Sequence, residues 1–244
     1  MIRSSRRLPL ALATIALLVA ACTGEPQVLA TIHIDPTPTP TARPPTQGEK
    51  AAEAFFKRVQ SGKLTYHAAF RGEIAGAISG LVVVGTIDVA GDDYSEALTF
   101  TFLRPPTVPV AVRSVGDRRW VQVDRGGWQK VNAAVASNNP FADVSAVTGT
   151  QLVRTEHVGA KDLHHIILTG GLIIAPDLIP AGNLTNEKIN STNLEVVIDD
   201  AGTPLTATWQ LDGEARVSGQ LQGLRVDIDM TFTNVDSKMT IKAP

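Results

Sequence analysis

The sequence is nearly without cysteine and is poor in aromatic side chains. Cys22 is the only cysteine among 244 residues, and aromatic residues make up 5% of the chain. A single cysteine excludes an internal disulfide, and without neighbouring His or Cys ligands it makes a poor metal site. It also lies at the end of an apolar segment near the beginning of the chain, which is a poor place for a catalytic thiolate. Its role must therefore follow from the residues around it.

The apolar run before this cysteine is too short for a permanent membrane-spanning helix. The run covers Leu8–Ala21, whereas a spanning helix needs about 20 apolar residues. Arg3, Arg6 and Arg7 precede the run, and the first acidic residue of the chain is Glu25. A cationic head, a short apolar middle and small residues at the end are typical of a secretory signal. We therefore expect residues 1–21 to be a signal peptide.

The four residues Val19-Ala20-Ala21-Cys22 give the cysteine a role. They resemble the lipobox of bacterial lipoproteins, in which the cysteine sulfur receives a diacylglycerol and the chain is cut just before it. The resemblance implies that Cys22 is the mature N-terminus and the site of lipidation. Two or three acyl chains would hold the protein at the extracytoplasmic face of a membrane of the bacterial cell envelope, because each buried methylene contributes roughly 0.8 kcal/mol. The alternative is a cleaved signal with an incidental cysteine.

A proline-rich segment follows the cysteine. Residues 36–45 read PTPTPTARPP, a composition that has little to bury and favours extended polyproline geometry of about 3.1 Å per residue. We expect residues 22–47 to be the lipidated cysteine and its tether. Residues 48–244 have the length of one domain.

The charge of the chain gives no reason to expect a nucleic-acid partner. Removing residues 1–21 removes three of the 22 basic residues and none of the 24 acidic ones, which leaves a net charge of about −5. A slightly acidic domain has no electrostatic attraction for nucleic acid or for anionic lipid.

The domain begins with a helix and continues with strands. The stretch EKAAEAFFKRVQSG, residues 49–62, predicts an amphipathic helix that Gly62 ends. The period then changes to two, as in RVDIDMTFTNV, residues 225–235. About ten short strands separated by Gly- and Asp-containing turns predict an antiparallel sheet with one apolar and one polar face. Residues 136–149 and 174–190 interrupt the pattern, and we expect these two segments to be helical or irregular.

An antiparallel sheet with one apolar face must cover that face. The sheet can curl upon itself, and the helix and the two interrupting segments can pack into its concave side. The result is a half-open barrel. The space between sheet and cover can be a filled core or a cavity, and the sequence leaves both open.

The whole layout resembles a known group of proteins. A lipobox, a spacer, one helix and then amphipathic strands are similar to LppX/LprG-type lipoproteins and, more distantly, to the LolA/LolB carriers. The segments that carry the likeness are AAEAFFKRVQSGKLTYHAAFRGEI, DRRWVQVDRGGWQKV, NPFADVSAVTG and LEVVIDDAGTPLTATWQL. The resemblance implies a mainly β (α+β) fold, namely a LolA-like half-open antiparallel β-barrel of about 10–11 strands, with helices and loops covering the concave face. It also implies an apolar cavity that accommodates acyl chains.

Large apolar residues at alternating positions are the candidates for the lining of that cavity. They are Leu64, Tyr66, Phe70, Leu98, Phe100, Phe102, Trp209, Met230 and Phe232. For each of them the alternative is ordinary packing in a filled core.

Motifs for covalent or metal chemistry are weak in this sequence. His164 and His165 are adjacent in a predicted strand, so their rings point to opposite faces and cannot bind one metal ion together. Asp227 and Asp229 lack the spaced acidic pattern of a calcium loop. Neither a Gly-x-Ser-x-Gly elbow nor a phosphate loop occurs. We therefore expect no enzyme, no metal site and no cofactor.

Two functions remain. The first is a membrane-anchored lipoprotein that binds or transfers an acylated lipid or other hydrophobic ligand in an apolar cavity, with an envelope transporter or acceptor protein as a further partner. The second is a tethered module that binds or senses an envelope protein through its surface and has no ligand cavity.

Overall fold

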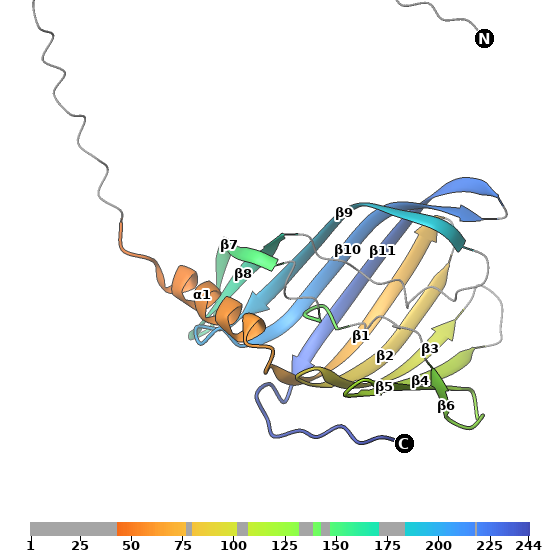
Figure 1. The fold of residues 1–244 in the computed structure, drawn as a ribbon. Coiled ribbons are helices and arrows are strands. Elements are labelled where there is room, and N and C mark those ends of the chain that lie inside the picture. The colour runs from red at the N-terminus through yellow and green to blue at the C-terminus, as the bar shows by residue number, and fades with distance from the viewer. Residues whose placement is uncertain are drawn as a thin grey trace, which may run out of the picture. The chain divides into compact units, whose positions relative to one another are not determined.

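A computed structural model of the chain describes residues 43–76, 80–101, 107–131, 139–142, 147–170, 184–217 and 219–244 (Figure 1). The chain divides into two compact units, Met1–Arg43 and Pro44–Pro244. The predicted signal peptide, Cys22 and the tether up to residue 42 lie outside the described residues. None of the helices in the described part has the length and the hydropathy to cross a membrane.

The predicted helix, α1, is Gln47–Gln60 and begins with a capping box. The backbone N–H of Glu49 donates to Oγ1 of Thr46 at 3.2 Å, and the N–H of Thr46 donates to Oε2 of Glu49 at 2.7 Å. This reciprocal pair satisfies two of the backbone donors that a helix start leaves free. Gly62, with a φ of 63°, follows the end of the helix. The face of α1 that carries Phe55 and Val59 is buried.

The rest of the unit is one 11-stranded antiparallel sheet. Its strands are β1 (Thr65–Gly76), β2 (Leu81–Ala90), β3 (Asp93–Thr101), β4 (Val108–Val115), β5 (Arg118–Val123), β6 (Gln129–Val131), β7 (Val147–Val158), β8 (Lys161–Gly170), β9 (Leu184–Ile198), β10 (Pro204–Val217) and β11 (Gln220–Thr233). The order across the sheet is β6-β5-β4-β3-β2-β1-β11-β10-β9-β8-β7. Strands β6 and β7 are its two edges and do not pair with each other, so the barrel is not closed. The predicted mainly β, half-open fold is confirmed.

The topology consists of two meanders joined in the middle. Strands β1 to β6 form one meander and β7 to β11 the other, and the first strand pairs with the last (Figure 1). Their register runs from His67 opposite Thr233 to Gly76 opposite Leu224. The two halves of the sequence thus share one continuous sheet.

Parts of the two interrupting segments are strand, and the prediction that they are helical or irregular is wrong there. Strand β7 already begins at Val147, and β9 already begins at Leu184. The reason is pairing with a long neighbour, because β9 pairs with β10 from Ile198 opposite Pro204 to Leu184 opposite Val217, with three register shifts along the way. Ladder hydrogen bonds to a long partner outweigh a local composition that favours loops.

The sheet has an inner face and an outer face. We define the inner face by the buried alternating residues, such as Tyr66 and Phe70 of β1 and Trp209 of β10, and the outer face by the residues between them, such as Arg71 and Thr208. Helix α1 packs against β7, β8 and β9. It lies on the inner face, because its Phe55 joins the apolar core that the inner-face residues form.

Candidate functional site

The predicted lining residues that the structure describes all lie on the inner face. Phe70 stands opposite Met230 of β11, and Ala68 stands opposite Phe232, so these side chains share one side of the sheet. Each described member is at most 7% exposed. They are Leu64, Tyr66, Phe70, Leu98, Phe100, Trp209, Met230 and Phe232. Phe102, the remaining candidate, lies outside the described residues.

The inner face is closely packed around Gly85. This glycine stands opposite Phe70 on one side and Leu98 on the other. A Cβ placed at Gly85 would lie 3.1 Å from the Phe70 ring, 3.0 Å from Cδ2 of Leu98 and 2.5 Å from the carbonyl oxygen of Ala97. The side chains of Phe70 and Leu98 therefore occupy the space beside Gly85 on the inner face.

Four aromatic rings form a cluster between α1 and the centre of the sheet. Phe141 meets Phe55 edge-on with the ring centroids 5.6 Å apart, and it meets Tyr66 in the same way at 5.9 Å. Phe232 stacks on Phe141 at 5.7 Å and meets Tyr66 edge-on at 5.1 Å. Such pairs stabilise by about 0.5–1.5 kcal/mol beyond their buried area. The cluster joins α1, β1, β11 and the short segment 139–142.

The hydroxyl of Tyr66 has a partner inside this cluster. It donates a hydrogen bond of 2.6 Å to Oδ1 of Asn139. Burial raises the pKa of Tyr66 well above its ordinary value, and the charge of Glu96 raises this pKa further. The phenol is thus held in its neutral, donating form.

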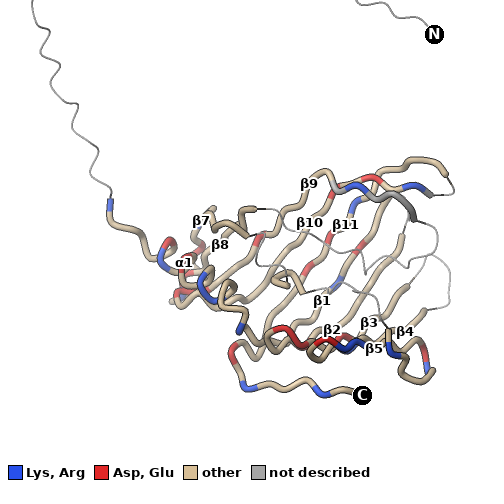
Figure 2. Tube along the Cα trace, viewed as in Figure 1, with Lys and Arg blue, Asp and Glu red and all other residues tan. Residues whose placement is uncertain are grey.

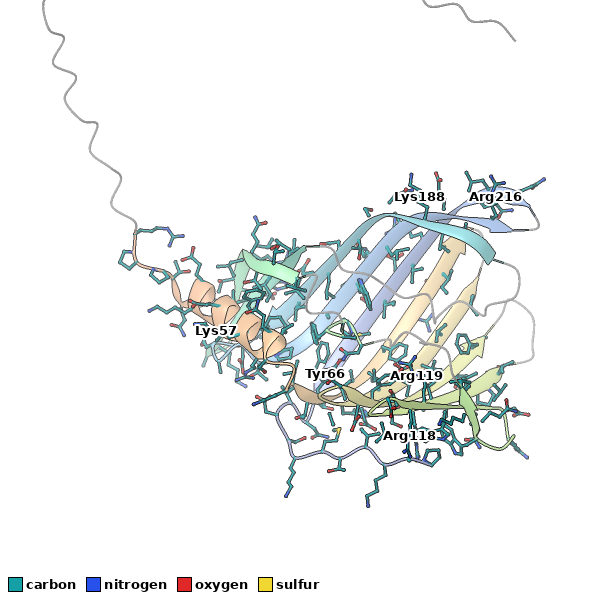
Figure 3. The ribbon with its side chains drawn as sticks, viewed as in Figure 1. Lys57, Tyr66, Arg118, Arg119, Lys188 and Arg216 are labelled. Atoms are coloured by element: carbon teal, nitrogen blue, oxygen red, sulfur yellow. The ribbon has the colours of Figure 1, made fainter. Side chains whose placement is uncertain are left out.

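The inner face also carries polar groups that the sequence analysis missed. Glu96 and Ser114 are buried there, and Arg119 stands opposite Ser114 on β5. In Figure 3 the side chain of Arg119 lies on the same side of the sheet as Tyr66, whereas the neighbouring Arg118 lies on the other side. The strand RRWVQV carried a signal for this, since an alternating strand that turns Val121 toward the apolar core must also turn Arg119 inward.

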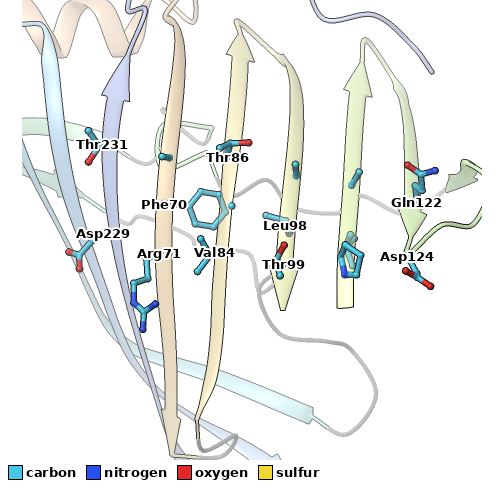
Figure 4. A pocket seen from close by; sticks show the side chains of 16 residues that line it. Phe70, Arg71, Val84, Thr86, Leu98, Thr99, Gln122, Asp124, Asp229 and Thr231 are labelled. Atoms are coloured by element: carbon cyan, nitrogen blue, oxygen red, sulfur yellow. The ribbon is translucent and has the colours of Figure 1, made fainter. Parts of the chain in front are cut away.

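The outer face is hollowed, and Figure 4 shows this hollow from close by. It is open and has a volume of about 720 Å³. Small side chains aligned across four strands line it, namely Ala69, Thr86, Ala97 and Ala111. Charged groups also line it, among them Arg71, Asp124 and Asp229. Phe70 and Leu98, two of the predicted lining residues, also border it, but most of its lining residues belong to the outer face.

Basic and acidic residues both occur along the strands of the sheet (Figure 2), and those of the outer face form local pairs. Nε of Arg225 donates to Asp227 at 2.8 Å, and Nη2 of Arg71 donates to Glu73 at 2.7 Å. The hydrogen bond from Arg225 lowers the pKa of Asp227. Oγ1 of Thr208 donates to Asp229 at 3.0 Å. Asp227 and Asp229 therefore belong to the polar face of the sheet, as their alternation predicts.

The two adjacent histidines point to opposite faces, as predicted for a strand. Nε2 of His164 lies 2.9 Å from Asp200, while Nδ1 of His165 lies 2.7 Å from Glu195. The ring of His157 contacts Asp162 instead of either histidine. In the described part of the chain, no group of three or more His, Cys, Asp or Glu side chains is arranged to hold a metal ion.

No family model and no curated protein matches the chain. Among solved structures, LprF of Mycobacterium bovis is similar with a TM-score of 0.41 and 12% identity over 80% of this chain and 97% of that one. The lipoprotein LppX of Mycobacterium tuberculosis has a TM-score of 0.40 and 16% identity over 79% of this chain and 97% of its own. A chain of the Pseudomonas aeruginosa MucA/MucB complex has a TM-score of 0.34 and 17% identity over 80% and 61%. LppX belongs to the lipoprotein group that the sequence resembles. The similarity between this chain and LppX is distant and concerns the fold.

Proposed function

We propose that the protein is a lipid-anchored carrier that binds the apolar part of a lipidic or other hydrophobic ligand against the inner face of its sheet. The observation that carries this proposal is the extent of the apolar face in a sheet that does not close. Buried apolar side chains continue from β8, through Trp209 and Phe70, to Val112 of β4. Helix α1, by contrast, packs mainly against β7, β8 and β9 among the described elements.

The physical basis of binding would be burial alone. An acyl chain in water gains about 25 cal/mol for each Å² of apolar surface that it buries. An unclosed sheet can open at its free edges, β6 and β7, without breaking the ladder between its central strands. A ligand can therefore enter along the inner face without covalent chemistry, and the proposal assigns no catalytic residue.

The proposed location follows from the N-terminal residues. Lipidation of Cys22 would anchor the protein at the extracytoplasmic face of an envelope membrane, and the segment up to Gln47 would hold the domain away from the surface. A carrier in this position takes a lipid from one membrane or transporter and gives it to an acceptor. The proposed partners are accordingly the membrane, an acylated ligand and an acceptor or transporter protein.

Native mass spectrometry of the full chain carrying Cys22→Ser tests the carrier. This substitution removes the anchor and keeps every other residue. We expect a bound mass of several hundred daltons after incubation with membranes, which denaturation releases. Phe100→Asp and Trp209→Asp should abolish the bound mass, because a buried unpaired carboxylate disfavours an apolar ligand.

The matched controls are Thr101→Asp and Thr206→Asp, which place the same charge on exposed outer-face positions of the same two strands. They should keep the bound mass. Circular dichroism of every variant separates loss of ligand from loss of fold, and Phe100→Ala provides a milder change at the same site. A clean apo mass for a folded protein, before and after incubation with membranes, would refute the carrier.

The second candidate is a tethered interaction module, and the hollow on the outer face favours it. The row Ala69, Thr86, Ala97 and Ala111 offers a shallow surface of small side chains, and Phe70 and Leu98 leave no space beside Gly85 on the inner face. This candidate predicts an apo mass together with a protein partner whose binding is lost on Ala97→Arg and kept on Phe100→Ala.

A further inference from the structure

Arg119 is the unusual residue of the inner face. The Nε and Nη1 atoms of its guanidinium are buried and have no hydrogen-bond partner. Arginine stays charged at every physiological pH, and a buried charge without a partner is strongly unfavourable in a folded protein. Among the described residues, these two nitrogen atoms of Arg119 therefore lack the acceptor that their burial calls for.

The surroundings of Arg119 are polar on one side and apolar on the other. Its guanidinium carbon lies 5.4 Å from the ring centroid of Tyr94. Tyr94, Ser114 and Arg119 form one row across β3, β4 and β5, and Glu96, Val112 and Val121 form the next row. Glu96, in that next row, is the acidic group of the inner face nearest to Arg119 in register. The ring of Tyr94 thus holds the guanidinium in place without neutralising it.

Other arginines of this region show the usual arrangement. Arg113, on the outer face of β4, lies over the Trp128 ring at 5.0 Å and donates to the carbonyl of Lys242 at 3.4 Å. Arg118 is exposed and is within 4.0 Å of Asp117. Arg119 differs from both in that its stacked guanidinium has two buried nitrogen atoms without an acceptor.

The position of Arg119 in the sheet relates it to the apolar face. Strand β5 is next to the edge strand β6, so Arg119 lies near one open side of the sheet. From there the inner face continues through Val112 to Leu98 and Phe70 at its centre. A molecule with its polar end at Arg119 would have its chain directed along apolar side chains.

We propose that Arg119 binds the anionic head of an amphiphilic ligand, a carboxylate or phosphate, while the acyl chain lies on the inner face toward Leu98 and Phe70. This inference rests on the proposed carrier function and narrows its ligand to acidic lipids or fatty acids. An arginine fork matches both head groups, since both present two oxygens to parallel N–H donors. Ser114 is the neighbouring hydroxyl that can donate to the same head.

Binding of head-group pairs to the full chain carrying Cys22→Ser tests this site. The probes are a fatty acid and the fatty alcohol of the same chain, and phosphatidic acid and the diacylglycerol of the same chains. We expect the acidic member of each pair to bind at least about tenfold more tightly. Arg119→Gln should remove that preference and leave the affinity for the neutral member unchanged. Arg118→Gln is the matched control, because it removes the same charge one residue away on the outer face, and it should keep the preference.

The outcomes separate this proposal from the carrier itself. If the wild type binds neither member of any pair, the carrier has failed. If it binds acidic and neutral members equally, or if Arg119→Gln keeps the preference, the anion site is overturned and the carrier stands. Inorganic phosphate is tested alone, and binding as tight as that of phosphatidic acid would overturn the amphiphile in favour of a free anion. Arg119→Lys keeps the charge without the planar fork, and it serves as the test if Arg119→Gln does not fold. It should reduce the preference for the acidic member of each pair.

Discussion

The hydroxyl of Tyr66 and the side-chain amide of Asn139 join the centre of the sheet to the short segment 139–142. The hydroxyl donates to Oδ1 of Asn139 at 2.6 Å, and the same oxygen accepts the backbone N–H of Phe141 at 2.8 Å. One amide oxygen thus satisfies a buried phenol and holds the loop that carries the Phe141 ring. Because Phe141 packs between Phe55 of α1 and Phe232 of β11, this hydrogen bond also supports the contact between helix and sheet.

Removing this hydrogen bond should destabilise the protein measurably. We expect Tyr66→Phe to lower the free energy of unfolding by about 1 kcal/mol, and Asn139→Ala by about 1–3 kcal/mol, because the alanine leaves a buried phenol without an acceptor. The double variant should lose less than the sum of the two. Urea unfolding of the four proteins measures this coupling, and strict additivity would show that the contact contributes nothing. Asn193→Ala, at an exposed position of β9, is the control.

Stability should fall at alkaline pH because of the same phenol. The pKa of Tyr66 is raised in the folded state, first by burial and then by Glu96, whereas an unfolded tyrosine has a pKa of about 10. The contribution of the neutral phenol to the free energy of unfolding is therefore complete below about pH 10. It is lost as the pH rises toward the folded pKa, because only the unfolded phenol releases its proton in that range. Unfolding free energies between about pH 8 and pH 11 should decrease more steeply for the wild type than for Tyr66→Phe. Equal slopes would contradict the assignment.

The sheet could be predicted from the sequence, whereas the use of its inner face could not. Period-two alternation is a local signal, and it placed Tyr66, Phe70 and Trp209 on one face correctly. The start of β9 at Leu184 depends on a partner strand, β10, that follows it in the sequence, so local composition gave the wrong structure there. Arg119 shares the face of these apolar residues, but a pattern of apolar positions gives no sign of a charged residue among them. Whether Gly85 leaves a vacant space depended on the orientation of the Phe70 ring, which no periodicity encodes.

Gly85 should tolerate no side chain. In Gly85→Ala the new methyl group would meet the carbonyl oxygen of Ala97 at 2.5 Å and the Phe70 ring at 3.1 Å, and the backbone atom cannot give way as a flexible side chain would. We expect a loss of about 1–3 kcal/mol in the free energy of unfolding. Gly223→Ala is the matched control, since it also lies in a strand and has nothing within 4 Å of the new Cβ. Equal stability of the two variants would show that the inner face has room to rearrange at Gly85.

The capping box at Thr46 should contribute to the attachment of α1. Thr46→Ala removes the acceptor for the Glu49 N–H and should cost about 1 kcal/mol, while Thr46→Ser keeps the hydroxyl and should cost little. Thermal unfolding of the two variants compares them directly. A serine variant as unstable as the alanine variant would show that the methyl group of Thr46 matters more than its hydroxyl.

Cys22 should decide where the protein resides. Because its sulfur is the only thiol of the chain, a lipid attached through sulfur has no other cysteine to use, and Cys22→Ser should release the protein from the membrane fraction of a bacterial host. A single acyl chain binds membranes only marginally, whereas two or three hold a protein firmly, so the change should be from almost fully bound to almost fully soluble. Fractionation and labelling with a radioactive fatty acid measure both effects. Ala30→Ser, a substitution of similar size in the predicted tether, should leave attachment and labelling intact. A labelled, membrane-bound serine variant would show that the anchor lies elsewhere, and the proposed orientation of the carrier toward the membrane would fall with it.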